Sequence, residues 1–282
     1  MEAAVKRRRR FNFRGSLCMP YGLFMALFVV LPLLLIIYYA FTDADGHFSI
    51  YNWKTVFSSV ENWKVIGMTF VIAGLTTLIC ILIAYPIAYI LSNKKFNKNK
   101  VLVYIFLLPM WINFVIRTNA LKDLVNGMTN SLFGWDITSE HPYASIVLGM
   151  VYDYLPFAIL PLYNQMLKMD KNQIEAAADL GANPFLVFVK AIIPMTIPGI
   201  ISACMMTFMP TMSSYVIADK MSENSKMIIG TLIQNYFLKS TDKIAMHVGS
   251  VLSLVMLMIV GVTLLAEKLI SGKDANKKEG IW

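Results

Sequence analysis

The stretch IEAAADLGANPFLVFVKAIIPMTIPGI, residues 174–200, follows one long apolar segment and leads into another. Gly181 stands where a helix needs a final residue in the left-handed conformation. Asn183-Pro184 then suits the start of a second helix, since Asn can cap it and Pro fits its first position. This second helix is expected to end shortly before Pro194, which limits or kinks the next apolar segment. The pattern predicts two short helices joined by a tight glycine turn.

The first of these helices has a distinct start and a distinct surface. Asp170 followed by Gln173 has the form of a capping box with Asp as the N-cap. The alanines at 176–178 give a face smooth enough for close approach by another protein. Glu175 and Asp179 are four residues apart and add a negative edge. The alternative is a loop helix that touches only lipid headgroups, but two carboxylates facing anionic lipid are unfavourable.

Composition places this hairpin in a membrane protein. The chain has 282 residues, of which 57% are hydrophobic and 15% charged, whereas soluble domains carry about 25% charged residues. The net charge of +8 does not indicate a nucleic-acid partner, because the basic residues cluster at the ends of apolar segments and no nucleic-acid-binding motif is present. The sequence therefore predicts an integral protein of the cell membrane that crosses it several times.

Six apolar segments can form the crossings, since about 20 helical residues span the bilayer core. They are residues 17–41, 65–91, 101–116, 144–166, 196–217 and 245–270. The third is short before Arg117, so it either tilts or continues as a helix along the outer interface through Leu121 and Val125. The first follows a basic stretch, but its apolar run is too long for a signal-peptide core and no small-x-small site follows it. We expect this helix to be retained.

Lys and Arg in the loops give the orientation. The N-terminus, the loops after segments two and four, and the C-terminus carry 17 of these residues, and the alternate loops carry 8. The positive-inside rule then places both termini and the hairpin in the cytoplasm. The expected fold is an all-α membrane protein of six transmembrane helices, with the hairpin between helices four and five. Its parts are a basic N-terminal tail (1–16), a first helix and outer loop (17–64), a transmembrane core (65–270) that contains the hairpin loop (168–194), and a cytoplasmic C-terminal tail (271–282).

The hairpin resembles the EAA motif of binding-protein-dependent ABC importer permeases, E-A-A-x3-G-x9-I-x-L-P. The matching residues are Glu175, Ala176, Ala177, Gly181 and Pro194. Ala191 and Ile193 depart from it, standing where the family usually has Ile and Leu. In the family this hairpin is the coupling helix, which docks in a groove of a cytoplasmic ATPase. The resemblance implies the same role here, with Asp179 on the same exposed edge.

A second resemblance, to the spermidine/putrescine permeases of this family, extends over most of the chain, from about Leu23 to Leu269. It is carried by LLPMWINFVIRTNALKDLV, GMVYDYLPFAILPLYNQMLKMDKNQIEAAADLGA and IIPMTIPGIISACMMTFMPTMSSYVIADKM. The pattern Pro109-x-Trp111-x-Asn113, with Arg117 behind it, is typical of that subgroup. The resemblance implies polyamine transport, ATP-binding cassette ATPase subunits, a second permease subunit and an extracellular polyamine-binding receptor.

Acidic residues near the membrane are the first candidates for a cation pathway, because a polycation cannot cross lipid unaided. Asp219 lies just past the outward end of segment five, and Tyr215, four residues earlier, shares its helical face. Together they can form an outer gate that attracts cations. The alternative for Asp219 is a loop carboxylate paired with Lys220 or Lys226.

Asp153 lies inside segment four and should face the bundle interior or water. It either contacts substrate or pairs with a basic residue such as Arg117. Trp111 and Asn113 lie near the outer end of segment three and are further candidates for the substrate pathway. The alternative for Trp111 is the aromatic belt at the membrane interface.

Other activities find little support in the sequence. The chain has no G-x-x-x-x-G-K-[ST] loop, so we expect no ATP hydrolysis, no enzymatic activity and no cofactor of its own; a partner subunit binds the ATP. Its three Cys and three His show no metal-ligand or catalytic spacing. Three alternatives stay open: a permease for another small solute, an ion-coupled secondary transporter that uses Asp153, and a membrane enzyme.

Overall fold

The computed structural model describes residues 13–93, 101–223, 225–239 and 243–279, and side-chain positions for most of these. The basic residues at 6–10 and the lysine-rich loop at 94–100 lie outside the described residues, as does the end of the C-terminal tail. Within the described part the chain is helical, with one isolated bridge between Thr42 and Phe48.

Five helices in the described part are long and apolar enough to cross a membrane, and a sixth crossing is possible if a bent pair counts as one. The first is built from α1 (Phe13–Met25), a π-helical turn (Ala26–Val30) and α2 (Leu31–Ala40). After α3 (Tyr51–Ser58) comes α4 (Val60–Ser92), and the other long helices are α8 (Pro142–Leu167), α11 (Ile193–Ser213) and α14 (Lys243–Glu279). They correspond to the expected segments one, two, four, five and six.

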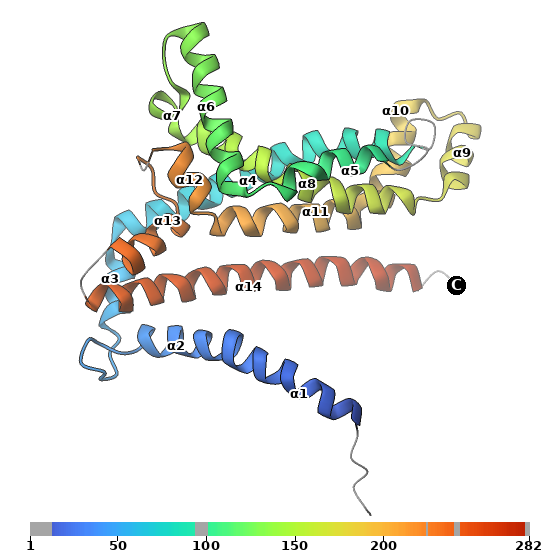
Figure 1. The fold of residues 1–282 in the computed structure, drawn as a ribbon. Helices are drawn as coiled ribbons and strands as arrows, with labels where there is room; N and C mark the ends of the chain where they lie inside the picture. The colour runs from blue at the N-terminus through green and yellow to red at the C-terminus, as the bar shows by residue number, and fades with distance from the viewer. Residues whose placement is uncertain (1–12, 94–100, 224, 240–242, 280–282) are drawn as a thin grey trace, which may run out of the picture.

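The third expected segment, 101–116, is bent and does not form one tilted helix, so the first of the two alternatives given for it was wrong. It consists of α5 (Val101–Leu107) and a 3-10 turn (Leu108–Trp111), followed after a bend of 94° by α6 (Phe114–Phe133). The break follows Pro109, and Ile112 has an extended backbone. The expected alternative, a helix that continues through Leu121 and Val125, agrees with α6. Figure 1 shows α6 running across the direction of α4 and α8.

The fifth expected segment, 196–217, has different limits at both ends. After α9 (Lys171–Asp179), the second hairpin helix α10 (Pro184–Val187) continues through a π-helical turn (Phe188–Ile192) into α11, so one apolar helix runs from Pro184 to Ser213. Pro194 does not interrupt it, because the wider π-turn just before it tolerates a residue that donates no hydrogen bond. The chain leaves the helix at Ser214, and Tyr215 begins a separate short helix.

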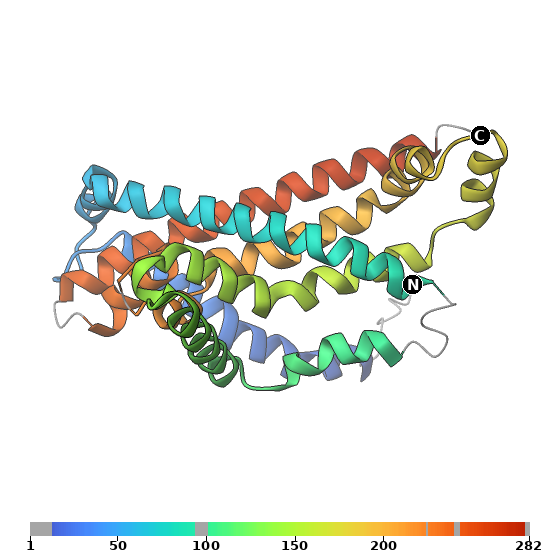
Figure 2. The same cartoon turned by 90° about the horizontal axis from the view of Figure 1, so that it is seen from above.

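Short helices close the end of the bundle away from the hairpin. They include α3, α12 (Val216–Met221) and α13 (Ile229–Gln234); a π-helical turn (Asn235–Lys239) then leads toward α14. The helices α9 and α10, the start of α1 and the C-terminal end of α14 all lie at the opposite end of the bundle (Figures 1 and 2). α7 (Ile137–Glu140) joins α6 to α8.

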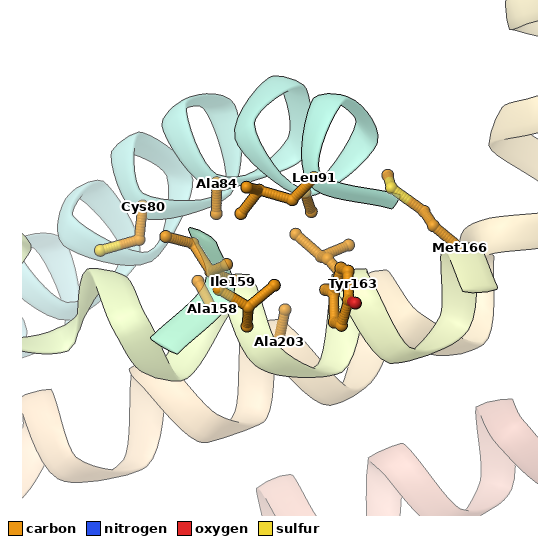
Figure 3. Packing of buried hydrophobic residues seen from close by; sticks show 11 residues of the cluster. Cys80, Ala84, Leu91, Ala158, Ile159, Tyr163, Met166 and Ala203 are labelled. Carbon is orange, nitrogen blue, oxygen red and sulfur yellow. The ribbon is translucent and has the colours of Figure 1, made fainter. Parts of the chain in front are cut away.

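The core of the bundle is formed by α4, α8 and α11, which pack most extensively against one another. Small residues on all three helices meet there, including Cys80 and Ala84 of α4, Ala158 of α8 and Ala203 of α11, and all four are fully buried (Figure 3). Small side chains let helix backbones approach closely, which is how helices associate in lipid. The core therefore combines close backbone contact with larger side chains such as Ile159 and Leu162, which are buried beside the small ones.

Gly199 shows how close this contact is. A Cβ atom on Gly199 of α11 would lie 2.6 Å from Cβ of Gln165 and 3.3 Å from the carbonyl oxygen of Pro161, both on α8. The side-chain amide of Gln165 also donates a 2.9 Å hydrogen bond to the carbonyl oxygen of Met195. α8 and α11 are thus fixed together at this point.

We expect Gly199→Ala to destabilise the protein. Overpacking of this kind costs about 1–3 kcal/mol, more than the roughly 1 kcal/mol that Ala gains over Gly as a helix former. Gly74→Ala is the matched control, because a Cβ there meets nothing within 4 Å. Thermal unfolding of the two variants in detergent should show a lower midpoint for Gly199→Ala, and equal midpoints would contradict the close α8–α11 contact.

Candidate functional site

The hairpin of α9 and α10 is capped at the predicted residues. Oδ1 of Asp170 accepts a 3.0 Å hydrogen bond from the backbone N–H of Asn172, and Oδ1 of Asn183 accepts one of 2.8 Å from that of Leu186. Both helices therefore begin directly after the residue whose side chain caps them. The cap at Asp170 uses Asn172 and not Gln173, so the N-cap is confirmed without the reciprocal capping box.

Gly181 joins the two helices in the left-handed conformation, with φ +84°. Its N–H donates to the carbonyl oxygen of Ala178 at 2.9 Å, and the N–H of Ala182 donates to that of Ala177 at 3.3 Å. These two bonds form a Schellman motif, which satisfies the last carbonyls of α9. Because every residue with a Cβ is strained at this φ, the turn depends on glycine.

The surface of the hairpin exposes both charged and apolar side chains. Glu175 and Asp179 are exposed on α9, as the sequence predicts for a negative edge. Ala176 is exposed and Ala177 half-buried, while Pro194 is exposed further along, in the first turn of α11.

Sequence reasoning missed the apolar tip of this hairpin. Leu180 is 88% exposed and Phe185 is 74% exposed, on either side of the Gly181 turn. Large apolar residues on both sides of a helix-ending glycine are a signal that could have indicated it. Figure 1 shows the hairpin of α9 and α10 at the end of the bundle, and the exposure of Leu180 and Phe185 leaves its tip accessible to another protein.

A second site is a buried ion pair between α6 and α8. Asp153 is 2% exposed and Arg117 8% exposed. Oδ1 of Asp153 accepts a 2.5 Å hydrogen bond from Nε of Arg117, and it also lies 2.5 Å from Nη2 of the same guanidinium. Oδ2 accepts a 2.8 Å hydrogen bond from the hydroxyl of Thr118. Of the two roles considered for Asp153, the pairing with Arg117 is thus present in the structure.

The same arginine also holds the bend between α5 and α6. Nη1 of Arg117 donates a 2.7 Å hydrogen bond to the carbonyl oxygen of Pro109, in the turn that precedes the bend. The guanidinium lies over the ring of Tyr152, 5.6 Å from its centroid. A buried charge is tolerated when it is paired and its remaining hydrogen bonds are made. Arg117 meets both conditions by joining α6, α8 and the 3-10 turn that follows α5.

Two further contacts fix α6 outside this pair. Nζ of Lys122 lies 2.8 Å from Oε1 of Glu223, and the hydrogen bond and positive charge of Lys122 hold the pKa of Glu223 below its ordinary value. The side chain of Asn126 donates a 2.8 Å hydrogen bond to the hydroxyl of Thr138 in α7. The angle of α6 is therefore held by contacts along much of its length.

The other two candidates in this region differ in their surroundings. Trp111 is 86% exposed at the end of the turn before the bend. Asn113 is the N-cap of α6, since its Oδ1 accepts a 2.9 Å hydrogen bond from the backbone N–H of Val115. Asn113 therefore stabilises the start of α6 at the bend, while the ring of Trp111 is exposed on the surface of the chain.

Tyr215 and Asp219 share one turn, as predicted, but on α12 and not at the end of a spanning helix. The N–H of Asp219 donates a 2.9 Å hydrogen bond to the carbonyl oxygen of Tyr215, the N-terminal cap of α12. Tyr215 lines a cavity of about 630 Å³ among α11, α13 and α14, whose lining does not include Asp219. α12 packs on both α6 and α8, whereas Asp153 lies near the middle of α8, so the five candidates do not all lie at one end of the bundle.

Residues 81–266 match the family model described as binding-protein-dependent transport system inner membrane component. The chain belongs to this family. It is accordingly a transport permease that resides in the cell membrane, and the resemblance drawn from the hairpin is confirmed. Among the described residues, no group of three or more His, Cys, Asp or Glu is placed to hold a metal ion.

Curated relatives and solved structures agree with this assignment. The chain is 32% identical over 263 residues to the spermidine/putrescine transport system permease protein PotB of Haemophilus influenzae, covering 87% of this chain and 91% of the relative. It is 30% identical over 255 residues to PotB of Escherichia coli K12, covering 86% and 91%. A bacterial ABC transporter that imports the acidic polysaccharide alginate has the same fold, with a TM-score of 0.70 at 16% identity over 91% of this chain and 95% of that one.

Replacing Asp153 with Asn should destabilise the permease, because it leaves the Arg117 cation buried without a counter-charge. Breaking a buried pair from one side costs about 3–5 kcal/mol. The double variant Arg117→Gln/Asp153→Asn removes both charges and should recover a large part of this loss. Asp123→Asn, at an exposed position of α6, is the control. Thermal unfolding in detergent measures all three, and a midpoint for Asp153→Asn equal to that of the control would refute the structural role of the pair.

Proposed function

We propose that this chain is the permease subunit of an ATP-driven importer that carries polyamines, spermidine or putrescine, across the cell membrane. The observation that carries the proposal is the rigid, capped hairpin at the end of the bundle, which offers a docking point for a separate ATPase. The substrate class is supported by the two PotB relatives, which are named spermidine/putrescine permeases and align with most of this chain.

The coupling surface consists of both charged and apolar parts of the hairpin. Leu180 and Phe185 project as an apolar tip suited to a groove in the ATPase, and Glu175 and Asp179 face the rim of that groove. Ala176 and Ala177 allow close approach, and the Gly181 turn keeps the two helices in a fixed relation. ATP is bound by the partner, since this chain has no phosphate-binding loop.

The orientation follows from charge and from the arrangement of the helices. The hairpin, the start of α1 and the end of α14 share one end of the bundle (Figure 1), and the loop charges assign that end to the cytoplasm. The bent pair of α5 and α6 then forms the third of six crossings. A second permease subunit completes the pathway, and an extracellular polyamine-binding receptor delivers substrate at the opposite end; an alginate importer of the same fold has been solved with its periplasmic protein.

The substrate enters at the end of the bundle where α6, α8 and α12 meet. Tyr215, beside the cavity among α11, α13 and α14, and Asp219 of α12 supply an aromatic face and a carboxylate for a cation, and Trp111 and Asn113 lie at the bend before α6. Asp153 supports the substrate pathway indirectly, by holding Arg117 in place. Its carboxylate already contacts both Arg117 and Thr118. Several weak contacts suit a route that must also release the cation.

Glu175→Lys should reduce both co-purification of the ATPase and ATP-dependent uptake, because it reverses a charge on the coupling surface. Glu61→Lys makes the same change on an exposed residue in the first turn of α4, at the other end of the bundle. We expect the control to retain both properties. If Glu175→Lys assembles and transports as well as Glu61→Lys, the coupling role of the hairpin is wrong.

Uptake of labelled spermidine by cells that carry the assembled transporter tests the substrate. Unlabelled spermidine or putrescine should compete, whereas amino acids and oxyanions should not, because the entry site offers a carboxylate and aromatic faces to a cation. Asp219→Asn should weaken spermidine uptake while the protein is still made in normal amounts. Uptake that persists when the gene is deleted from a strain without a second polyamine system contradicts the polyamine assignment and leaves a permease for another small solute.

A further inference from the structure

An apolar groove runs along the side of the bundle between α4 and α8, with α6 at one end. Its volume is about 840 Å³ and nearly all of its lining is apolar. Val71 and Leu75 of α4 and Leu148 and Tyr152 of α8 line it and are partly exposed. These positions lie in two membrane-spanning helices, so the groove is open to lipid.

The length of the groove matches one leaflet of a bilayer. On α4 it extends from Met68 to Ile79 and on α8 from Tyr143 to Leu155, which at 1.5 Å per residue is about 17 Å and about 18 Å. Half of the hydrocarbon core of a bilayer is about 15 Å thick. The groove thus accommodates an acyl chain of one leaflet, and α4 and α8 both begin at the end of the bundle away from the hairpin.

A polar pocket adjoins the groove at that same end. The two share Tyr143 and Ala144, and the pocket is also lined by Glu140, His141 and Lys226. Nζ of Lys226 lies over the ring of Tyr143, 5.4 Å from its centroid. The surface therefore changes from apolar to charged where a lipid changes from acyl chain to headgroup.

The charges in the pocket suit a headgroup that carries both signs. Lys226 and Glu140 line the same pocket, and in the described part of the chain the ion pairs are Arg117–Asp153 and Lys122–Glu223, so these two are not paired with each other. His141 caps α8 without a side-chain hydrogen bond. The His141 side chain therefore does not accept from the first N–H groups of the helix, those of Tyr143 and Ala144. These groups add positive partial charge to the pocket.

We propose that the groove and the pocket together bind one zwitterionic phospholipid with a primary ammonium headgroup, phosphatidylethanolamine. The phosphate lies against Lys226 and the start of α8, the ammonium donates to Glu140, and an acyl chain fills the groove. The lipid belongs to the leaflet on the side away from the hairpin, which is the outer leaflet under the orientation proposed above. Tyr152 lines the groove and lies beneath Arg117, so the bound lipid also covers the α6–α8 ion pair from the membrane side.

Native mass spectrometry of the assembled, delipidated transporter in detergent tests this binding. The complex is titrated separately with dioleoyl-phosphatidylethanolamine, -phosphatidylcholine and -phosphatidylglycerol. We expect tightest retention of phosphatidylethanolamine, because phosphatidylcholine has no ammonium N–H for Glu140 and phosphatidylglycerol has no cation. Lys226→Gln and Glu140→Gln should each weaken its retention by about tenfold, the effect of one charge-assisted hydrogen bond. Leu148→Trp should block the groove.

Two control variants match these changes outside the site. Lys220→Gln removes a charge from an exposed position of α12, and Leu82→Trp adds the same bulk on an exposed part of α4 beyond the groove. Both should retain phosphatidylethanolamine as the unmodified chain does. Equal retention of the three lipids, or unchanged retention in Leu148→Trp, overturns the proposal. The proposal is also overturned if the Leu148→Cys variant forms a disulfide with the second permease subunit, since the groove would then be a subunit contact.

Spermidine uptake by the same preparations, returned to vesicles, separates this inference from the proposed function. Lipid retention without any polyamine uptake removes the assigned substrate and leaves the lipid site in place. Polyamine uptake without selective lipid retention removes the lipid site and leaves the assigned substrate in place.

Discussion

A charge that cannot reach water must find its partner inside the protein, and the pair between Arg117 and Asp153 meets that requirement for this bundle. The arginine would be far too costly to leave unpaired beside lipid. Its three groups of contacts are with the carboxylate on α8, the carbonyl oxygen before the bend and the ring of Tyr152. These contacts tie α6 to α8 and to the turn before the bend, and so they hold α6 at its steep angle to α5. The position of α12, which packs on α6 and α8, follows from this angle.

The packing of the remaining helices has a different basis. α4, α8 and α11 have small residues where they meet, which let their backbones approach closely, and larger side chains such as Ile159 and Leu162 fill the space between them. The first span, by contrast, buries little of its surface within this chain, which leaves an apolar helix to be covered by lipid or by another subunit. Such a face is expected of a permease that assembles with a second permease subunit, as proposed above.

The local features of this chain were the most predictable from its sequence. Caps at Asp170 and Asn183 and the turn at Gly181 depend on a few neighbouring residues, and all three are observed. The apolar runs of segments one, two, four and six likewise give the spanning helices to within a few residues, but the helix of segment five begins at Pro184, well before residue 196. The steep angle of the bend after Trp111 was not predicted, although a helix that continues past Arg117 was one of the alternatives, because the angle depends on contacts such as the ion pair between residues 36 positions apart. The exposed Leu180 and Phe185 were also missed, since composition alone treats apolar residues as buried.

The uninterrupted helix from Pro184 to Ser213 has a mechanical consequence. Its 30 residues make a rod about 45 Å long, with the hairpin tip at one end and the region around Tyr215 at the other. Tilting such a rod by about 5° would displace one end relative to the other by roughly 4 Å. Because Gly199 is a close contact between the rod and α8 near its middle, a tilt about that point would move the two ends in opposite directions. The contact at Gly199, which packs the core, thus also sets how far one end of the helix moves when the end at the other face of the membrane is displaced.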